Sequence, residues 1–143
     1  MLRYILTLLI VLNLSACGFS EGMDETNAMV DHFHELTNKQ DHQAVYNMGN
    51  AAFKAAVSYE ILDNLLKLRH DNLGKSLAKT RTGYKFATGL SGKTITVSFA
   101  TEFQLGNAAE TFNFTVKDNQ YYLLGYNFKV TNINKKASET VTV

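Results

Sequence analysis

The sequence predicts an α+β domain in which three N-terminal helices pack on a curved, four-stranded antiparallel sheet. Apolar residues recur every three or four positions up to Gly74, and then on alternate positions from about Thr94 to Val130. The pairs Gly106-Asn107 and Asp118-Asn119 separate the alternating runs. Such short turns join antiparallel neighbours, so the helices are followed by a meander of strands.

The first helix is expected to begin at Asp24 or Thr26, which are good capping residues, and to end near Asn38. Its apolar positions have the spacing of one buried stripe: Met29, Val30, Phe33 and Leu36. This stripe predicts that the first helix lies against the sheet.

The second helix is expected to follow Asp41 and to bend at Gly49-Asn50. The third is capped by Ser58 and stops at Gly74, since glycine takes a positive φ without strain. The third helix has a wide apolar face: Ile61, Leu62, Leu65, Leu66, Leu68 and Leu73.

The four strands differ in regularity. The first runs from about Ser76 to Thr88 and alternates poorly. The other three have an apolar face: Ile95, Val97, Phe99, Thr101 and Phe103; Phe112, Phe114 and Val116; Tyr122, Leu124, Tyr126, Phe128 and Val130. The last strand is apolar on its other side too, through Tyr121 and Leu123, so we expect it inside the sheet or covered on both faces.

The N-terminus has the pattern of a bacterial lipoprotein signal. Arg3 precedes the apolar run Tyr4–Leu12, which is too short for a bilayer span of roughly 20 residues. Leu14-Ser15-Ala16 then stands before Cys17, the one cysteine of the chain. The pattern predicts a diacylglycerol thioether on Cys17, with an acyl chain such as palmitate on the new N-terminus, because two or three chains anchor a protein stably.

Cleavage before Cys17 divides the chain into a signal peptide (1–16), a lipidated N-terminus and tether (17–23), a roll domain (24–131) and a polar C-terminal tail (132–143). The expected location is the cell envelope, with the domain facing the periplasm and the membrane as its first partner. Gly18 follows the cysteine, where an aspartate would signal inner-membrane retention, so the outer membrane is favoured in a Gram-negative cell.

Composition excludes several classes of function. Loss of Arg3 with the leader leaves 13 of the 14 basic residues against 13 acidic ones, and nucleic-acid binding needs a basic surface. Once Cys17 is modified, no thiol remains for a disulfide or a thiolate metal site. The chain also lacks tryptophan, so its 9 Phe and 7 Tyr supply most of the bulky packing.

Several segments together resemble a known family. They are Phe53–Ser58, Arg69, Leu73-Gly74, Arg81, Phe99–Phe103, Ala109–Thr111 and Gly125-Tyr126. In this order they resemble small bacterial exported domains of unknown function, and the resemblance covers about Val45 to Phe128. It implies the cystatin-like roll of the nuclear transport factor 2 superfamily, and no catalytic residue or cofactor. Family members often carry tryptophan where this chain has Ile61 and Tyr121 or Tyr122.

Glu110 is the leading site candidate. By strand parity it shares a face with Phe112 and Phe114, so we expect it at the rim of the apolar face, where burial would raise its pKa. The favoured interpretation is a structural ion pair with Arg69 or Arg81 that pins strand to helix; ligand contact or catalysis is the alternative. Tyr126 is expected either to line a pocket or to belong to the core.

No metal site is expected. Four candidate ligands cluster in the sequence: Asp31, His32, His34 and His42. His32 and His34 diverge because residues two apart on a helix do not share a face, so we interpret the cluster as solvated helix surface. His70-Asp71 diverges likewise, and a histidine near a helix C-terminus is favourable through the helix dipole alone.

Three functions therefore remain open, and one of them is a purely structural anchor domain. The first is a non-catalytic envelope lipoprotein that binds a protein partner or a small apolar ligand. The second is a small isomerase or dehydratase that uses a pocket carboxylate such as Glu110 with a tyrosine. An open cavity with an unpaired acid would favour the enzyme, whereas a filled interior with Glu110 bonded to arginine would exclude it.

Overall fold

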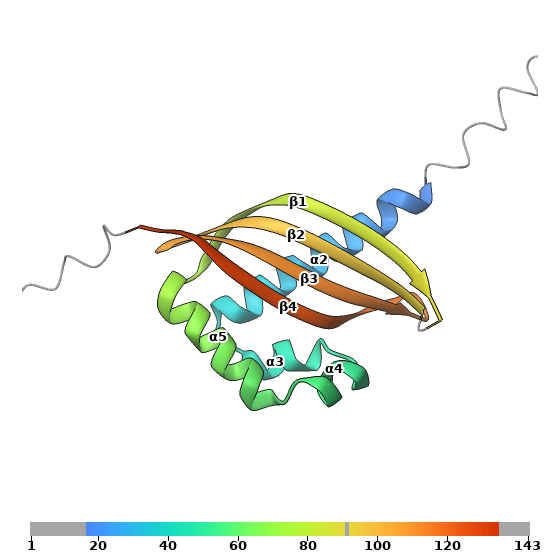
Figure 1. Cartoon of the computed structure of the whole chain (residues 1–143), viewed down its shortest axis with the longest axis horizontal. Coiled ribbons are helices and arrows are strands. Elements are labelled where there is room, and N and C mark those ends of the chain that lie inside the picture. The colour runs from blue at the N-terminus through green and yellow to red at the C-terminus, as the bar shows by residue number, and fades with distance from the viewer. Residues whose placement is uncertain (1–16, 91, 135–143) are drawn as a thin grey trace, which may run out of the picture.

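The computed structural model describes residues 17–90 and 92–134, so the predicted leader and the end of the tail lie outside them. Within these residues four helices precede four strands (Figure 1). The helices are α2 (Cys17–Asn38), α3 (His42–Asn47), α4 (Ala51–Ala56) and α5 (Tyr59–Leu73). The strands are β1 (Ser76–Gly89), β2 (Gly92–Phe103), β3 (Gly106–Lys117) and β4 (Gln120–Ile133). The predicted α+β class is confirmed, with four helices in place of three.

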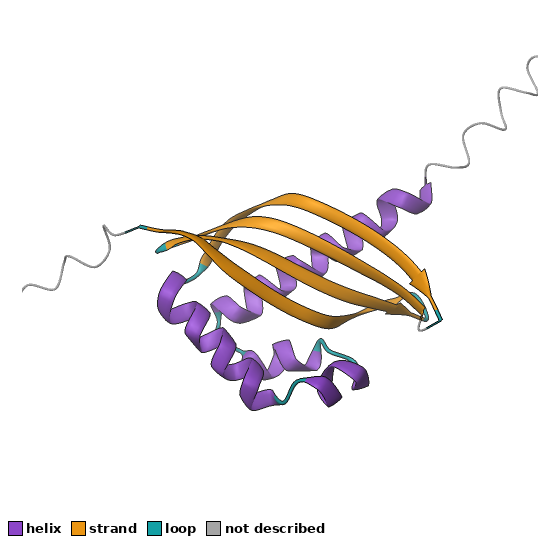
Figure 2. Cartoon of the chain, viewed as in Figure 1, coloured by secondary structure: helices purple, strands orange, loops and turns teal. Residues whose placement is uncertain are grey.

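The strands form one antiparallel sheet in the order β1-β2-β3-β4. The sheet curves, and the helices lie on one side of it (Figure 2). β1 has two register irregularities, next to Ser76 and between Arg81 and Gly83, which explain its poor alternation.

Helix α2 begins at Cys17, and so the expected tether over residues 17–23 is helical instead. Thr26 lies within the helix, buried, with its hydroxyl bonded to the Gly22 carbonyl at 2.9 Å, so it does not cap the helix. The predicted end at Asn38 is confirmed. The Asn38 side chain accepts from the Ser76 backbone N–H at 2.9 Å, which joins the end of α2 to the start of β1.

The bend expected at Gly49-Asn50 is a complete break between α3 and α4. The Met48 carbonyl accepts from the Leu123 backbone N–H at 2.8 Å, and Gly49 forms a parallel bridge with Leu123 on β4. A Cβ on Gly49 would lie 2.1 Å from the Phe53 ring, so only glycine fits. Asn50 then caps α4 by accepting from the Phe53 N–H at 2.9 Å.

Helix α5 has the predicted ends, because Ser58 accepts from the Ile61 N–H and Gly74 has a φ of 73°. Its wide apolar face is two adjacent stripes. The buried stripe consists of Leu62, Leu66, Arg69 and Leu73. On the other stripe Ile61 is 62% exposed and Leu68 is 57% exposed, so this stripe stays largely uncovered in the described chain.

Strand β4 corrects two expectations. It is an edge strand rather than an interior one, and the break between α3 and α4 covers part of its free edge. A bulge shifts its register between the pairs Asn113–Gly125 and Phe114–Leu123. Leu123 is therefore fully buried, whereas the hydroxyl of Tyr122, which was expected to face the core, bonds to Gln120.

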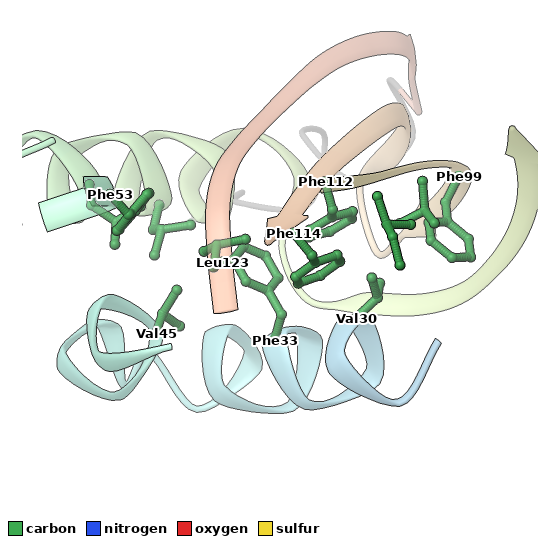
Figure 3. Close-up of a cluster of buried hydrophobic side chains, with 12 residues drawn as sticks. Val30, Phe33, Val45, Phe53, Phe99, Phe112, Phe114 and Leu123 are labelled. Atoms are coloured by element: carbon green, nitrogen blue, oxygen red, sulfur yellow. The ribbon is translucent and has the colours of Figure 1, made fainter. Parts of the chain in front are cut away.

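The core lies between the four helices and the sheet, as Figure 3 shows. Val30 and Phe33 of α2 point toward the sheet, and the Phe33 ring meets that of Phe112 edge-on at 5.0 Å. The inward parity predicted for β2 and β3 is confirmed by buried side chains: Ile95, Val97, Phe99, Thr101, Phe103, Phe112 and Phe114. Among the described residues no helix is long and apolar enough to cross a membrane.

Candidate functional site

Glu110 lies deep inside the fold. On β3 it pairs with Phe99 of β2 and with Phe128 of β4. Its side chain faces the helices, as parity predicts, but the residue is 0% exposed rather than at the rim of the apolar face. A carboxylate without water is stable only if hydrogen-bond donors surround it.

Four side chains supply those donors. On one oxygen, Oε2, Glu110 meets His34 Nε2 at 2.7 Å and accepts from Thr101 Oγ1 at 2.6 Å. On the other, Oε1, it accepts from the Tyr126 hydroxyl at 2.6 Å and from Arg69 Nη1 at 3.3 Å. Because an ionised carboxylate only accepts, His34 Nε2 carries the proton. We call these five residues the Glu110 cluster.

Arg69 is the cluster's cation. It occupies an inner position of α5 between leucines and is 1% exposed. Its guanidinium lies 5.3 Å from the Phe103 ring centroid and 5.7 Å from that of Phe33, and such contacts favour a desolvated cation. Nη1 also approaches the Tyr126 hydroxyl at 3.4 Å, while Nε has no partner in the described chain.

The charges of the cluster determine its pKa shifts. Burial raises the pKa of Glu110, but the hydrogen bond and charge of His34, with the Thr101 and Tyr126 hydroxyls, lower it below the usual 4.5 in sum. The pKa of Glu110 is therefore lowered, and not raised as burial alone would make it. Burial, and then the charge of Glu110, raise the pKa of Tyr126 well above 10.0, so Tyr126 stays a donor.

The arrangement leaves little room for catalysis by the carboxylate. Both Glu110 oxygens are engaged, and the Tyr126 hydroxyl already donates to one of them. A general base needs an oxygen within reach of a substrate proton, and an oxyanion donor needs a free hydroxyl. The bond to Arg69 is the outcome that was expected to exclude the enzyme.

The sequence names four possible site residues besides Cys17, and the fold brings three of them together: Glu110, Arg69 and Tyr126. Arg81 stays apart. It is half-buried on β1, forms no ion pair within the described chain, and has a buried Nε without a partner there. Cys17 is the first residue of α2.

The histidines correct the expectation of a solvated surface. His34 and His42 are buried, and His42 Nδ1 lies 2.7 Å from Asp63 Oδ1. His32 is exposed, as predicted, and His70 makes no bond to Asp71. Across the described residues, no three His, Cys, Asp or Glu side chains gather in a way that would hold a metal ion.

A polar groove of about 490 Å³ lies between the C-terminal half of α2 and the start of β1. Its lining includes Asp31, Glu35, Asn38 and Lys79. His34 is the one member of the Glu110 cluster that borders it, with its side chain 10% exposed. The imidazole thus reaches this groove, and Tyr126 is the other member of the cluster that is partly exposed.

Sequence reasoning missed His34 and Thr101 as partners of Glu110. A signal was present for both. His34 follows Val30 by four residues and so continues the buried stripe of α2, and Thr101 alternates with Phe99 on the inner face of β2. A search of the sequence for apolar residues alone misses polar residues that occupy inward-facing positions.

A scan against protein-family models finds no match for the chain, and a search of curated proteins finds no significant match.

Proposed function

We propose that the chain is a lipid-anchored, non-catalytic binding domain of the bacterial cell envelope. One observation carries the proposal: the carboxylate expected to do chemistry is fully buried and has four donors. The cluster holds α2 and α5 to the sheet, because His34 and Arg69 reach Glu110 from different helices. The isomerase or dehydratase alternative would need Glu110 to be released from Arg69.

The roll of the nuclear transport factor 2 superfamily is the finer fold we propose. A curved antiparallel sheet with α2 and three further helices on one side supports it. In such a roll a pocket would open beneath the sheet. Here the aromatic core occupies that space, since Phe33 contacts the rings of both Phe112 and Tyr126.

The anchor we propose is a thioether-linked lipid on Cys17, with the domain facing the periplasm and, in a Gram-negative cell, attached to the outer membrane. The motif Leu14–Cys17 supports it. Mass analysis of the purified protein tests it: a chain that begins at a diacylated Cys17 is expected. An intact initiator methionine with a free thiol would refute the anchor.

The outer stripe of α5 is the surface we propose for a protein partner. Ile61 and Leu68 expose more than half of their surface on one helix face, and exposed apolar side chains that lie together on one face commonly mark an interaction site. A protein partner is therefore favoured over a small apolar ligand.

Crosslinking in intact cells, read by mass spectrometry, tests this surface. The double variant Ile61→Glu/Leu68→Glu is expected to lose one specific crosslinked partner that the native protein retains. Ile133→Glu is the matched control, because Ile133 is 55% exposed on β4, outside α5. Identical crosslinks in all three proteins, or an apolar ligand that co-purifies with the protein, would count against the proposal.

A further inference from the structure

The start of α2 and two hairpin turns lie at one end of the molecule. Figure 1 shows the first turns of α2, the β1–β2 connection and the β3–β4 connection at this end. The contacts of Gly22 agree: a Cβ there would lie 3.3 Å from the Tyr84 hydroxyl, 3.7 Å from Ile95 and 3.7 Å from the Tyr121 hydroxyl. The N-terminal part of α2 therefore crosses β1, β2 and β4 near the two turns.

The turns extend as far as the start of α2 does. From Gly22 back to Cys17 the helix advances about 7.5 Å, at 1.5 Å per residue. From Ile95 back to Gly92 strand β2 advances about 10 Å, at roughly 3.3 Å per residue. Cys17 is the first residue of α2, so no flexible linker separates a lipid on Cys17 from the helix. Such a lipid would therefore hold the hairpin ends at the bilayer surface.

The β1–β2 hairpin end carries exposed apolar residues. Leu90 is fully exposed beside the turn, and Phe86, four residues before it on β1, is 50% exposed. Phe86 pairs with Ile95, whose side chain is buried, so Phe86 points to the side of the sheet on which α2 lies. Both residues lie outside the core. Contact of their apolar surface with water is unfavourable unless something covers it.

The hairpins carry more lysine than acid, whereas the start of α2 carries acids. Exposed lysines on the two hairpins are Lys85, Lys93 and Lys117, and Asp118 is the one exposed acid among the described residues of the turns. Asp24 and Glu25 are exposed on α2, but they lie about 10–12 Å along the helix from Cys17. Glu21 is closer still to Cys17 in the sequence, so the charges at this end of the molecule nearly balance.

We propose that the tip of the β1–β2 hairpin, through Leu90 and Phe86, dips into the lipid interface beside the anchor. This second contact rests on the lipid anchor of the proposed function. Exposed apolar side chains held beside a membrane gain free energy by entering the boundary of headgroups and acyl chains. The domain would then have one fixed orientation, with the α5 stripe free for a partner.

The depth of a fluorophore in the bilayer tests the contact between the hairpin tip and the lipid. In the full chain, the introduced thiol of Leu90→Cys carries an environment-sensitive fluorophore, and Ile61→Cys is the control, an exposed apolar position on α5. The protein is reconstituted in vesicles of phosphatidylethanolamine and phosphatidylglycerol that contain a lipid-borne quencher. We expect the emission of the label at position 90 to be blue-shifted, and to be quenched several-fold more than that of the label at position 61.

Equal quenching at both positions, or a label at 90 that emits as in water, would overturn the proposal. Protein that does not associate with the vesicles would overturn it as well. Mass analysis of the same sample reports whether Cys17 carries lipid, so a failed anchor is separated from a failed tip contact. In the anchored protein, Leu90→Ser/Phe86→Ser is expected to free the domain's orientation, seen as faster fluorescence depolarisation of a label at 61. Unchanged depolarisation would contradict the contact.

Discussion

Two histidines of the described chain are buried, and each meets a carboxylate at 2.7 Å: His34 with Glu110, and His42 with Asp63. The carboxylates differ in what surrounds them. Glu110 is 0% exposed and its remaining partners are buried or half-buried, whereas the Asp63 side chain is 17% exposed and also bonds to Lys67 on the surface. Loss of the histidine is therefore expected to cost more stability at Glu110 than at Asp63, because only Asp63 can then be solvated by water.

The largest expected effect is the loss of the buried charge. Glu110→Gln keeps the size of the side chain but leaves the Arg69 guanidinium, 1% exposed, without a counter-charge. Removing one partner of a buried pair costs about 3–5 kcal/mol in the free energy of unfolding. Urea unfolding followed by circular dichroism measures it, and a loss below about 1 kcal/mol would show that the cluster is not needed for the fold.

A double variant separates charge from packing. Glu110→Gln/Arg69→Met removes both charges and keeps an apolar stem on the inner stripe of α5. We expect it to recover much of the free energy that Glu110→Gln loses, because replacing a whole buried pair is often close to neutral. A double variant as unstable as the sum of the single ones would show that the two residues act independently.

The two histidines give the second prediction. His34→Leu removes a donor from a carboxylate that water cannot reach, and is expected to cost about 1–3 kcal/mol. His42→Leu is expected to cost less, because Asp63 keeps Lys67 and gains water. The same urea titrations compare the two variants directly, and equal losses would mean that burial of the carboxylate does not decide the cost.

The sequence predicts most of the fold because burial and strand parity are local patterns. It predicts the inner faces of β2 and β3, the caps Ser58 and Gly74, and the end of α2. It does not predict the bulge in β4, which lets both Leu123 and Tyr126 face the core, since a bulge is a property of strand pairing. The break at Gly49 likewise depends on a bond to β4, more than 70 residues away in sequence.

The site is only half predictable for a related reason. The position of Glu110 follows from parity and Arg69 is a correct partner, but the choice between Arg69 and Arg81 needs tertiary structure. The direction of the Glu110 pKa shift could not be predicted either, because burial and bonding oppose each other and His34 decides the sum.

The pH dependence is the third prediction. The folded pKa of Glu110 lies below its usual 4.5, so its contribution to stability is complete above about pH 4.5 and is lost as the pH falls through the folded pKa. The native protein is expected to lose stability in that window, and Glu110→Gln to lose less over the same range. Urea midpoints at a series of pH values test this, and parallel curves for the two proteins would contradict it.

The smallest expected effect is at the exposed pair. The pKa of Asp63 is held below its usual 3.8 by the hydrogen bond to Lys67 first and by His42 second. Lys67→Met is therefore expected to raise the pKa of Asp63 toward 3.8, to leave that of Glu110 unchanged, and to alter the urea midpoint little, because the lysine is 59% exposed. Carboxyl NMR titration measures both residues in one sample. If the Glu110 resonance shifts as well, the two histidine–carboxylate pairs are coupled, and the contrast between a sealed cluster and a solvated one does not hold.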